Sequence, residues 1–255
     1  VCRAASLRSY SPLPVAAVLV VVPPSLLAPC ALARGVPSLR EFFSRRVGER
    51  LRAERQPAAV VHAHHLLAHV ADLNDFVSGI HAIVKKTGVV VVEAPYLRDL
   101  IERCEFDTIY HEHLCYFSLT ALTPLFKRHG LQVQGVERVP IHGGSLRVEV
   151  VDAEVGGADP SVTRMLAEEA AWGVADVRTY QAFSARVEAM KRTLTGTLRQ
   201  LKARGDRIAA YGAAARGRTL LNSFGSGCDT PGLVGAPSPP EQAPQTPGGP
   251  PTRPP

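Results

Sequence analysis

The chain has 255 residues, of which 45% are hydrophobic and 20% are charged, so it can bury a core and is not wholly disordered. Its net charge of +6 comes from scattered arginines rather than a basic block, which does not favour a nucleic-acid partner. Five widely spaced cysteines without a C-x-x-C pair predict reduced thiols in a cytoplasmic protein and no metal site.

The first 33 residues differ from the rest of the chain, and we expect them to be atypical and poorly ordered. An apolar run over residues 15–33 superficially fits a signal peptide. Pro23 and Pro24 interrupt this run, which is also too short to cross a bilayer as a helix. Because the following sequence is typical of a cytosolic protein, we expect a cytoplasmic location and no membrane partner.

From about Glu41 the pattern of apolar residues becomes regular and predicts an α/β protein. The expected elements, in chain order, are a helix over 41–54, a strand over 58–65, a helix over 73–88, a strand over 89–96, a helix over 120–130, and strands over 131–139 and 145–153. Phe42 is expected to face inward from the first helix, and Gly88 to end the second. Thr120 and Gly130 are the expected caps of the third helix. The apolar strand over 89–96 is typical of a parallel sheet that helices cover on both faces.

Residues 160–204 have a helical pattern, followed by a strand, a glycine-containing turn and a helix over 206–225. An apolar stripe runs along the helical part and indicates a core contact. Its members are Val187, Met190, Leu194, Leu198 and Leu201.

The end of the predicted strand over 58–65 is rich in histidine, with His62, His64, His65 and His69. Along a strand the first two share a face, and the last two are four residues apart, as zinc ligands on a helix would be. No cysteine or carboxylate completes a metal site at ligand spacing. We therefore expect a strand end that lines a pocket.

The densest group of titratable side chains lies in FDTIYHEHLCYFS, residues 106–118. If Ile109 ends a strand, Tyr110 and Glu112 share one face and His113 lies on the other, and all three can converge where the strand ends. A histidine accepts a proton near neutral pH, a glutamate can orient its ring, and a tyrosine can donate to a developing oxyanion.

A purely structural role is the alternative for this group, with a histidine in the core and Glu112 paired with Arg98 or Arg103. For any single residue this alternative is favoured. Because titratable clusters concentrate at functional sites, the whole group favours proton transfer.

Two turns contain glycines that allow backbone to approach a ligand closely. In PIHGGSLRV, residues 140–148, an arginine next to the turn suits a phosphate or a keto oxygen, although a plain hairpin has the same pattern. In YGAAARGRTLLN, residues 211–222, a helix N-terminus near Arg216 suits a phosphate, although the pattern is not G-x-G-x-x-G.

Together these segments resemble the sugar C-methyltransferases, which use S-adenosylmethionine (SAM) to alkylate nucleotide-linked keto-deoxysugars. The matching pieces are LAHVADLNDF, GVVVVEAPYL, EFDTIYHEHLCYFS, HGGSLRV, YGAAARG and TLLN, in the order of the family. The resemblance extends from about Arg34 to Cys228. It implies a partial class I (Rossmann-like) methyltransferase sheet, then a helical segment and a C-terminal Rossmann-like α/β domain. The implied regions are an N-terminal segment over 1–33, a partial SAM-dependent domain over 34–153, an incomplete C-methyltransferase domain over 154–230, and a disordered proline-rich tail over 231–255.

The resemblance also implies a role for each matching residue. His113 would be the general base, with Glu112 and Tyr110 beside it in the catalytic site. SAM would be contacted at His64, His65 and His69. The nucleotide-linked sugar would be bound by His142, Gly143, Gly144, Ser145, Arg147, Tyr211, Gly212, Arg216, Gly217 and Asn222.

The chain also departs from the family pattern. It has no set of zinc cysteines, no glycine-rich loop before residue 41 and no acidic residue for the SAM ribose. Ala63, His64 and His65 replace the usual Ala-Asn-Asn, and Arg216 and Arg218 replace a lysine and an asparagine. We therefore expect an inactive fragment, truncated at the zinc and SAM-loop end. The alternative to a methyltransferase fragment is a catalytically inactive remnant that can at most bind a nucleotide sugar. A measured SAM affinity separates these two hypotheses.

Overall fold

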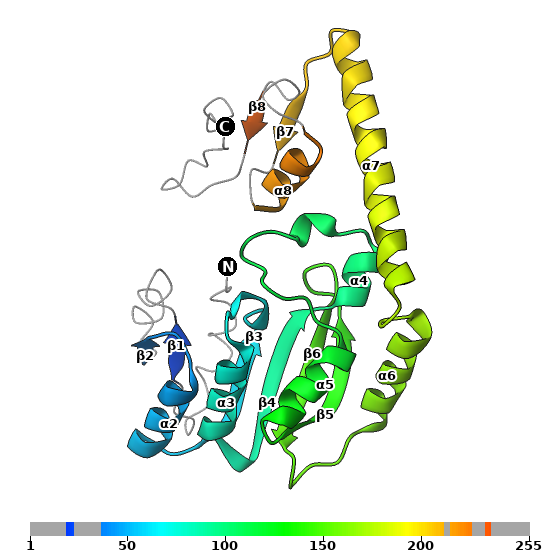
Figure 1. The fold of residues 1–255 in the computed structure, drawn as a ribbon. Helices are drawn as coiled ribbons and strands as arrows, with labels where there is room; N and C mark the ends of the chain where they lie inside the picture. Colours follow the sequence, from blue (N-terminus) through cyan, green and yellow to red (C-terminus); the bar gives the residue numbers. More distant parts are fainter. Residues whose placement is uncertain (1–18, 23–36, 212–214, 226–232, 236–255) are drawn as a thin grey trace. The chain divides into compact units, whose positions relative to one another are not determined.

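The computed structural model describes residues 19–22, 37–211, 215–225 and 233–235, and it has the predicted α/β character (Figure 1). The predictions for the rest of the N-terminal segment and for most of the proline-rich tail lie outside these residues. The chain divides into two compact units. Unit 1 comprises residues 1–96 and 117–169, and unit 2 comprises residues 97–116 and 170–255.

Unit 1 contains most of the strands. Its elements are β1 (Val20–Val22), β2 (Ser38–Arg40), α2 (Arg45–Glu54), β3 (Ala58–His64), the 3-10 helix η2 (Leu67–His69), α3 (Leu73–Ile83), β4 (Val84–Pro95), α5 (Leu119–Arg128), β5 (Leu131–Val139), β6 (Ser145–Asp152) and most of α6 (Pro160–Trp172). Unit 2 contains α4 (Leu97–Glu102), the 3-10 helix η3 (Phe106–Thr108), α7 (Val177–Ala203), β7 (Ala209–Tyr211), α8 (Ala215–Ser223) and β8 (Leu233–Gly235).

A four-stranded sheet with the order β3-β4-β6-β5 forms the centre of unit 1. Within this sheet β3 and β4 are parallel, whereas β6 runs antiparallel to both of its neighbours. In register, His64 lies beside Glu93, and Glu93 lies beside Arg147. The carboxyl ends of β3 and β4, the β5–β6 turn and the start of β6 therefore meet at one edge of the sheet.

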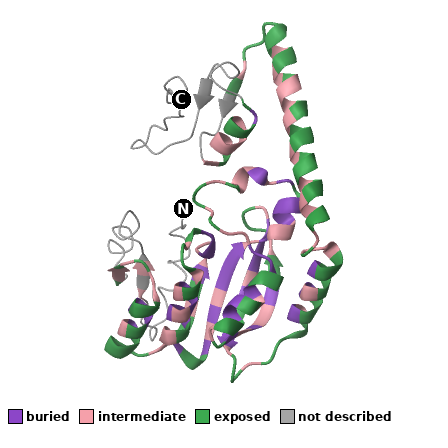
Figure 2. Cartoon of the chain, in the orientation of Figure 1, coloured by how far each residue is buried: buried purple, intermediate pink, exposed green. Residues whose placement is uncertain are grey.

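Helices α3 and α5 lie on the same face of this sheet, and α2 packs on α3 (Figure 1). Helices α2 and α3 approach closely at Gly48 and Gly79, where a Cβ on Gly48 would lie 2.3 Å from the carbonyl oxygen of Gly79. The fully buried residues of unit 1 follow the inner strands and this helical face (Figure 2). They include Ile80, Val90, Val92, Leu122, Phe126, Leu146 and Val148.

Two predicted helix starts were wrong. Phe42 is 72% exposed and lies before α2, because the hydroxyl of Ser44 accepts from the Val47 N–H and caps the helix there. Helix α5 is capped by Ser118 rather than Thr120. Thr120 is already helical, and its N–H donates to the carboxylate of Glu169.

Two predicted helix ends also changed. Helix α3 stops at Ile83, because Val84 already pairs with Ala58 as the first residue of β4, and Gly88 lies inside that strand. Helix α5 is capped by His129 rather than by the expected Gly130, which follows one position later with left-handed backbone.

The apolar stripe of the long helix α7 was predicted to pack in a core. This prediction was wrong, because the described residues of unit 2 do not bury the stripe. None of the described residues of α7 is buried, and Met190 is 38% exposed (Figure 2). The helix is anchored near its middle, where the Arg186 guanidinium donates to the carbonyl groups of Ile101 and Glu102. In the part of the chain that the structure describes, no helix combines the length and apolar character needed to span a membrane.

Candidate active site

A buried carboxylate organises the polar edge of the unit 1 sheet. Glu93, near the end of β4, is 3% exposed and accepts hydrogen bonds from His65 Nε2 at 2.8 Å and from Arg147 Nε and Nη2 at 3.2 and 3.0 Å. Arg147 also donates through Nη1 to Glu137 at 2.6 Å. The ring of His142 packs against the ring of His65, with the two ring centroids 4.5 Å apart. We call these five residues the Glu93 cluster.

Burial and charge act in opposite directions on the basic members of the Glu93 cluster. Burial lowers the pKa of His65, the nearby His142 lowers it further, and Glu93 only partly compensates. For Arg147, burial works against the charge, but the hydrogen bonds and negative charges of Glu93 and Glu137 raise the pKa overall. The cluster thus favours a neutral His65 beside an ionised Arg147.

The backbone around this cluster is left-handed at three successive positions of the β5–β6 turn. The φ angles are +52° at His142, +86° at Gly143 and +126° at Gly144. His65 also has a positive φ, of +48°. Non-glycine residues rarely adopt this conformation, and such strain concentrates at functional sites.

The β5–β6 turn is closed by its own polar groups. The buried Ser145 hydroxyl donates to the Ile141 carbonyl at 2.9 Å, and the Gly144 carbonyl accepts from the Tyr96 N–H at 3.0 Å. The predicted ligand Ser145 is thus engaged in holding the turn.

The other predicted histidines lie around the end of β3. His62 Nδ1 and His64 Nε2 lie 3.3 Å apart, and burial, followed by the proximity of His64, lowers the pKa of His62. His69 is exposed at the end of η2. Among the described residues no group of three or more His, Cys, Asp or Glu side chains could hold a metal ion.

Residues 106–116 of unit 2, which we call the His113 loop, contain the predicted catalytic group. The expected strand end at Ile109 was wrong, because the segment forms η3 and then a turn over residues 110–112. This turn still brings His113 back to η3, where its Nδ1 lies 2.8 Å from the carbonyl oxygen of Thr108. A carbonyl only accepts, so Nδ1 bears the proton and Nε2 is the basic nitrogen of the neutral ring.

Two tyrosines frame His113. The hydroxyl of Tyr110 lies 3.4 Å from His113 Nε2, and the centroids of the Tyr110 and His113 rings are 4.5 Å apart. Burial raises the pKa of Tyr110, and the charge of Glu112 raises it further, so its hydroxyl stays a proton donor. Tyr116 donates to the His113 carbonyl at 3.3 Å.

Glu112 was predicted to orient the base, but the group that holds His113 Nδ1 is the Thr108 carbonyl. The Glu112 side chain is exposed, and it lies 3.9 Å from the even more exposed His111. A backbone carbonyl has no side-chain signature, so only the turn geometry reveals the role of Thr108.

The predicted sugar-binding residues of unit 2 lie on α8 and around the turn before it. Tyr211 ends β7, Gly217 and Asn222 lie on α8, and Gly212 lies outside the described residues. The Arg216 guanidinium binds both carboxylate oxygens of Asp107 in the His113 loop, at 2.9 Å each.

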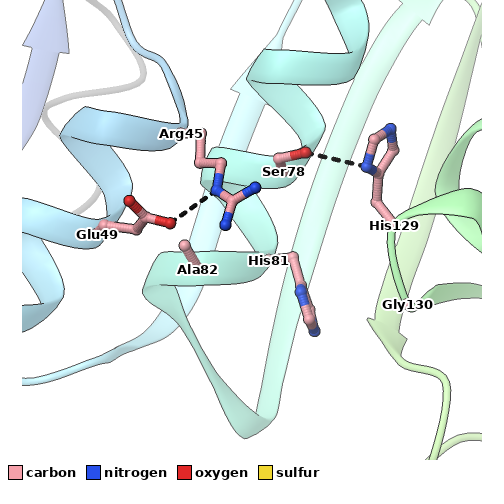
Figure 3. Close-up of a pocket in the computed structure, with 7 residues that line it drawn as sticks. All are labelled: Arg45, Glu49, Ser78, His81, Ala82, His129 and Gly130. Atoms are coloured by element: carbon pink, nitrogen blue, oxygen red, sulfur yellow. Dashed lines mark hydrogen bonds and ion pairs between the residues drawn. The ribbon is translucent and has the colours of Figure 1, made fainter.

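A surface hollow of about 390 Å³ lies elsewhere in unit 1, between α2, α3 and the start of β5 (Figure 3). Ser78 Oγ and His129 Nδ1 lie 3.0 Å apart at its edge, and Arg45 and Glu49 form an ion pair along α2 on one side of it. The hollow adjoins the C-terminus of α3, which leads into the start of β4. It is therefore at the amino end of that strand, whereas Glu93 lies near its carboxyl end.

Comparisons with known proteins match both halves of the chain. Residues 29–136 match a family described as "Methyltransferase domain", and residues 140–248 match "C-methyltransferase C-terminal domain". The C-methyltransferase NovU of Streptomyces niveus is 38% identical over 211 residues, which are 81% of this chain and 50% of that protein. The chain thus spans about half the length of this curated relative.

Solved structures are similar at lower identity. The PH0226 protein of Pyrococcus horikoshii has a TM-score of 0.44 and 15% identity, covering 58% of this chain and 74% of that one. A SAM-dependent methyltransferase of Thermotoga maritima has a TM-score of 0.38 and 18% identity, covering 51% and 71%.

Proposed function

We propose that this chain, which matches a methyltransferase domain followed by a C-methyltransferase C-terminal domain, belongs to a SAM-dependent C-methyltransferase of nucleotide-linked keto-deoxysugars. The observation that supports it most is the geometry of His113 in the Tyr-His-Glu-His segment. A neutral imidazole with its proton fixed on Nδ1 presents Nε2 as a base, and a tyrosine hydroxyl lies beside that nitrogen.

In the proposed reaction His113 Nε2 removes the proton from a carbon next to the sugar ketone. The C–H electron pair moves into the new C=C bond, and the carbonyl oxygen becomes an enolate. Tyr110 is positioned to donate to that oxygen, since its raised pKa keeps the hydroxyl protonated. The Thr108 carbonyl stabilises the imidazolium through the Nδ1 proton.

SAM is the methyl donor that this function requires, and the described residues fit it only in part. His64 ends β3, where a cofactor would be expected in an α/β sheet, and His69 ends the following η2. The carboxylate nearest to them in register is that of Glu93, which is buried and already bonded to His65 and Arg147. Among the described residues we identify no carboxylate suited to the SAM ribose, and we assign no SAM contact.

The proposal is tested by separating proton removal from methyl transfer. The purified chain is mixed in D₂O with a nucleoside-diphosphate-linked keto-deoxysugar, and the proton next to the ketone is followed by NMR. We expect exchange for deuterium without SAM, and neither micromolar SAM binding by calorimetry nor methylated product. Sugar binding without exchange would contradict the proposal and support a silent nucleotide-sugar-binding protein.

A further inference from the structure

Helix α8 is joined to the His113 loop by a bidentate ion pair. Nε and Nη2 of Arg216 donate to Oδ2 and Oδ1 of Asp107, both at 2.9 Å, across 109 positions of sequence. The fork is strengthened by Glu105, which lies 3.5 Å from Nη2. Hydrogen bonding to Asp107 raises the pKa of Arg216, although burial opposes it. The two parallel hydrogen bonds fix both position and orientation, which a lysine could not do.

An aromatic contact supports the same junction. Phe106 of η3 stacks on Phe224, just after α8, with ring centroids 5.4 Å apart and an interplanar angle of 28°. Both rings are buried, at 7% and 4% exposure. The apolar stack and the ion pair hold adjacent residues of η3, so the α8 segment contacts this 3-10 turn in two different ways.

The junction is one residue away from the group that orients the base. Thr108 follows Asp107 directly, and its carbonyl accepts the Nδ1 proton of His113 at 2.8 Å. The Thr108 hydroxyl donates to the Glu105 carbonyl at 2.7 Å, so the Thr108 side chain is bonded to the residue that precedes η3. A shift of Asp107 would therefore move the Thr108 carbonyl and release the His113 ring.

We propose that Arg216 is a positioning residue for His113: by holding Asp107 it fixes η3, and thereby the tautomer and direction of the base. This role rests on the proposed function for its catalytic consequence. Its structural consequence is independent, because the ring tautomer can be measured without any substrate. The guanidinium fork that a diphosphate would need is already occupied by Asp107, which favours positioning over phosphate binding.

The test uses the full chain with ¹⁵N-labelled histidine and long-range ¹H–¹⁵N correlation spectra, in which an assigned His113 reports its protonated nitrogen. We expect a protonated Nδ1 in the wild type, and a loss of that preference in Arg216→Ala and in Asp107→Asn. Arg204→Ala is the matched control, since Nε and Nη2 of Arg204 also donate to an aspartate, both to Oδ2 of Asp206 at the end of α7. We expect it to leave the His113 spectrum unchanged.

A second measurement keeps the proposal testable if Arg216→Ala does not fold. Arg216→Lys retains the charge but not the fork, and in the deuterium-exchange assay we expect about a tenfold to hundredfold lower kcat with an unchanged KM. An unchanged His113 tautomer in folded Arg216→Ala, or a raised KM with normal kcat in Arg216→Lys, would overturn the role. If the wild type shows no exchange, the proposed function fails while the tautomer measurement still decides the positioning role.

Discussion

The Glu93 cluster and the His113 loop each contain a histidine and a glutamate, but in different arrangements. In the cluster a buried carboxylate is central and binds both a histidine and an arginine. In the loop the carboxylate of Glu112 is exposed, and the histidine is held by a backbone carbonyl beside a tyrosine. A histidine bonded to a buried carboxylate is fixed in place, whereas His113 keeps its basic nitrogen beside a weak, long contact.

We infer from this difference that burial and partners, rather than residue type, decide which histidine is suited to accept a proton. A saturated buried network contributes to rigidity, and removing one member leaves the others unsatisfied. We therefore expect the Glu93 cluster to affect mainly stability and the His113 loop mainly proton transfer.

The largest effect on stability is expected from Glu93→Ala. The change removes the buried partner of Arg147 and His65, so the free energy of unfolding should fall by about 3–5 kcal/mol. Urea unfolding monitored by circular dichroism measures it. Glu137→Ala is the matched control. It removes the other carboxylate partner of Arg147; the Glu137 side chain is 58% exposed, so its loss should cost less than about 1 kcal/mol. Equal losses in both variants would contradict the central role of Glu93.

A smaller effect is expected from pH. The pKa of His65 is lowered in the folded protein, so below pH 6.5 the unfolded chain takes up a proton that the folded chain does not. The free energy of unfolding should therefore fall on acidification from pH 6.5 towards the lowered pKa. The loss is at most about 1.4 kcal/mol per pH unit for one proton.

The variant His65→Gln should flatten this pH dependence, and urea unfolding at several pH values measures the slope. Some slope should remain from His62, whose pKa is also lowered. The exposed His69 serves as control, and His69→Gln should keep the wild-type slope. An identical slope in the His65→Gln variant would show that this imidazole is not linked to folding.

The smallest effect on stability is expected from His113→Ala. The ring is half-buried, and the substitution removes mainly the hydrogen bond between Nδ1 and the Thr108 carbonyl, so the cost should be about 1 kcal/mol or less. Thermal unfolding measures it. A destabilisation as large as that of Glu93→Ala would mean that this loop is itself a structural centre.

Many of the helices and strands could be predicted from apolar periodicity, and the incorrect predictions have physical causes. The strands β3, β5 and β6 were predicted close to their observed bounds, because alternation and β-branched residues are local signals. The end of α3 was missed, because the pairing of Val84 with Ala58 depends on a strand 26 positions earlier. The stripe on α7 showed only that one helix face is apolar, and periodicity does not identify what covers it.

The candidate site was predictable in its side chains but not in its backbone. The sequence indicated His113, Tyr110 and Arg216, yet it could not show that the Thr108 carbonyl lies against His113 Nδ1 or that Asp107 binds the arginine. Likewise Glu93 was predicted only as part of a buried strand, since the pairing of Arg147 with it depends on the register of β4 and β6.

The most direct test of the account compares the wild-type chain with His113→Ala in D₂O, using a nucleoside-diphosphate-linked keto-deoxysugar and no SAM. The rate at which the proton next to the ketone disappears from the NMR spectrum is measured for each protein at equal concentration. We predict exchange by the wild type and a rate roughly two to four decades lower in the variant, the usual loss on removing a general base. Equal exchange rates in the two proteins, or none above buffer in either, would contradict the assignment of His113 as the base.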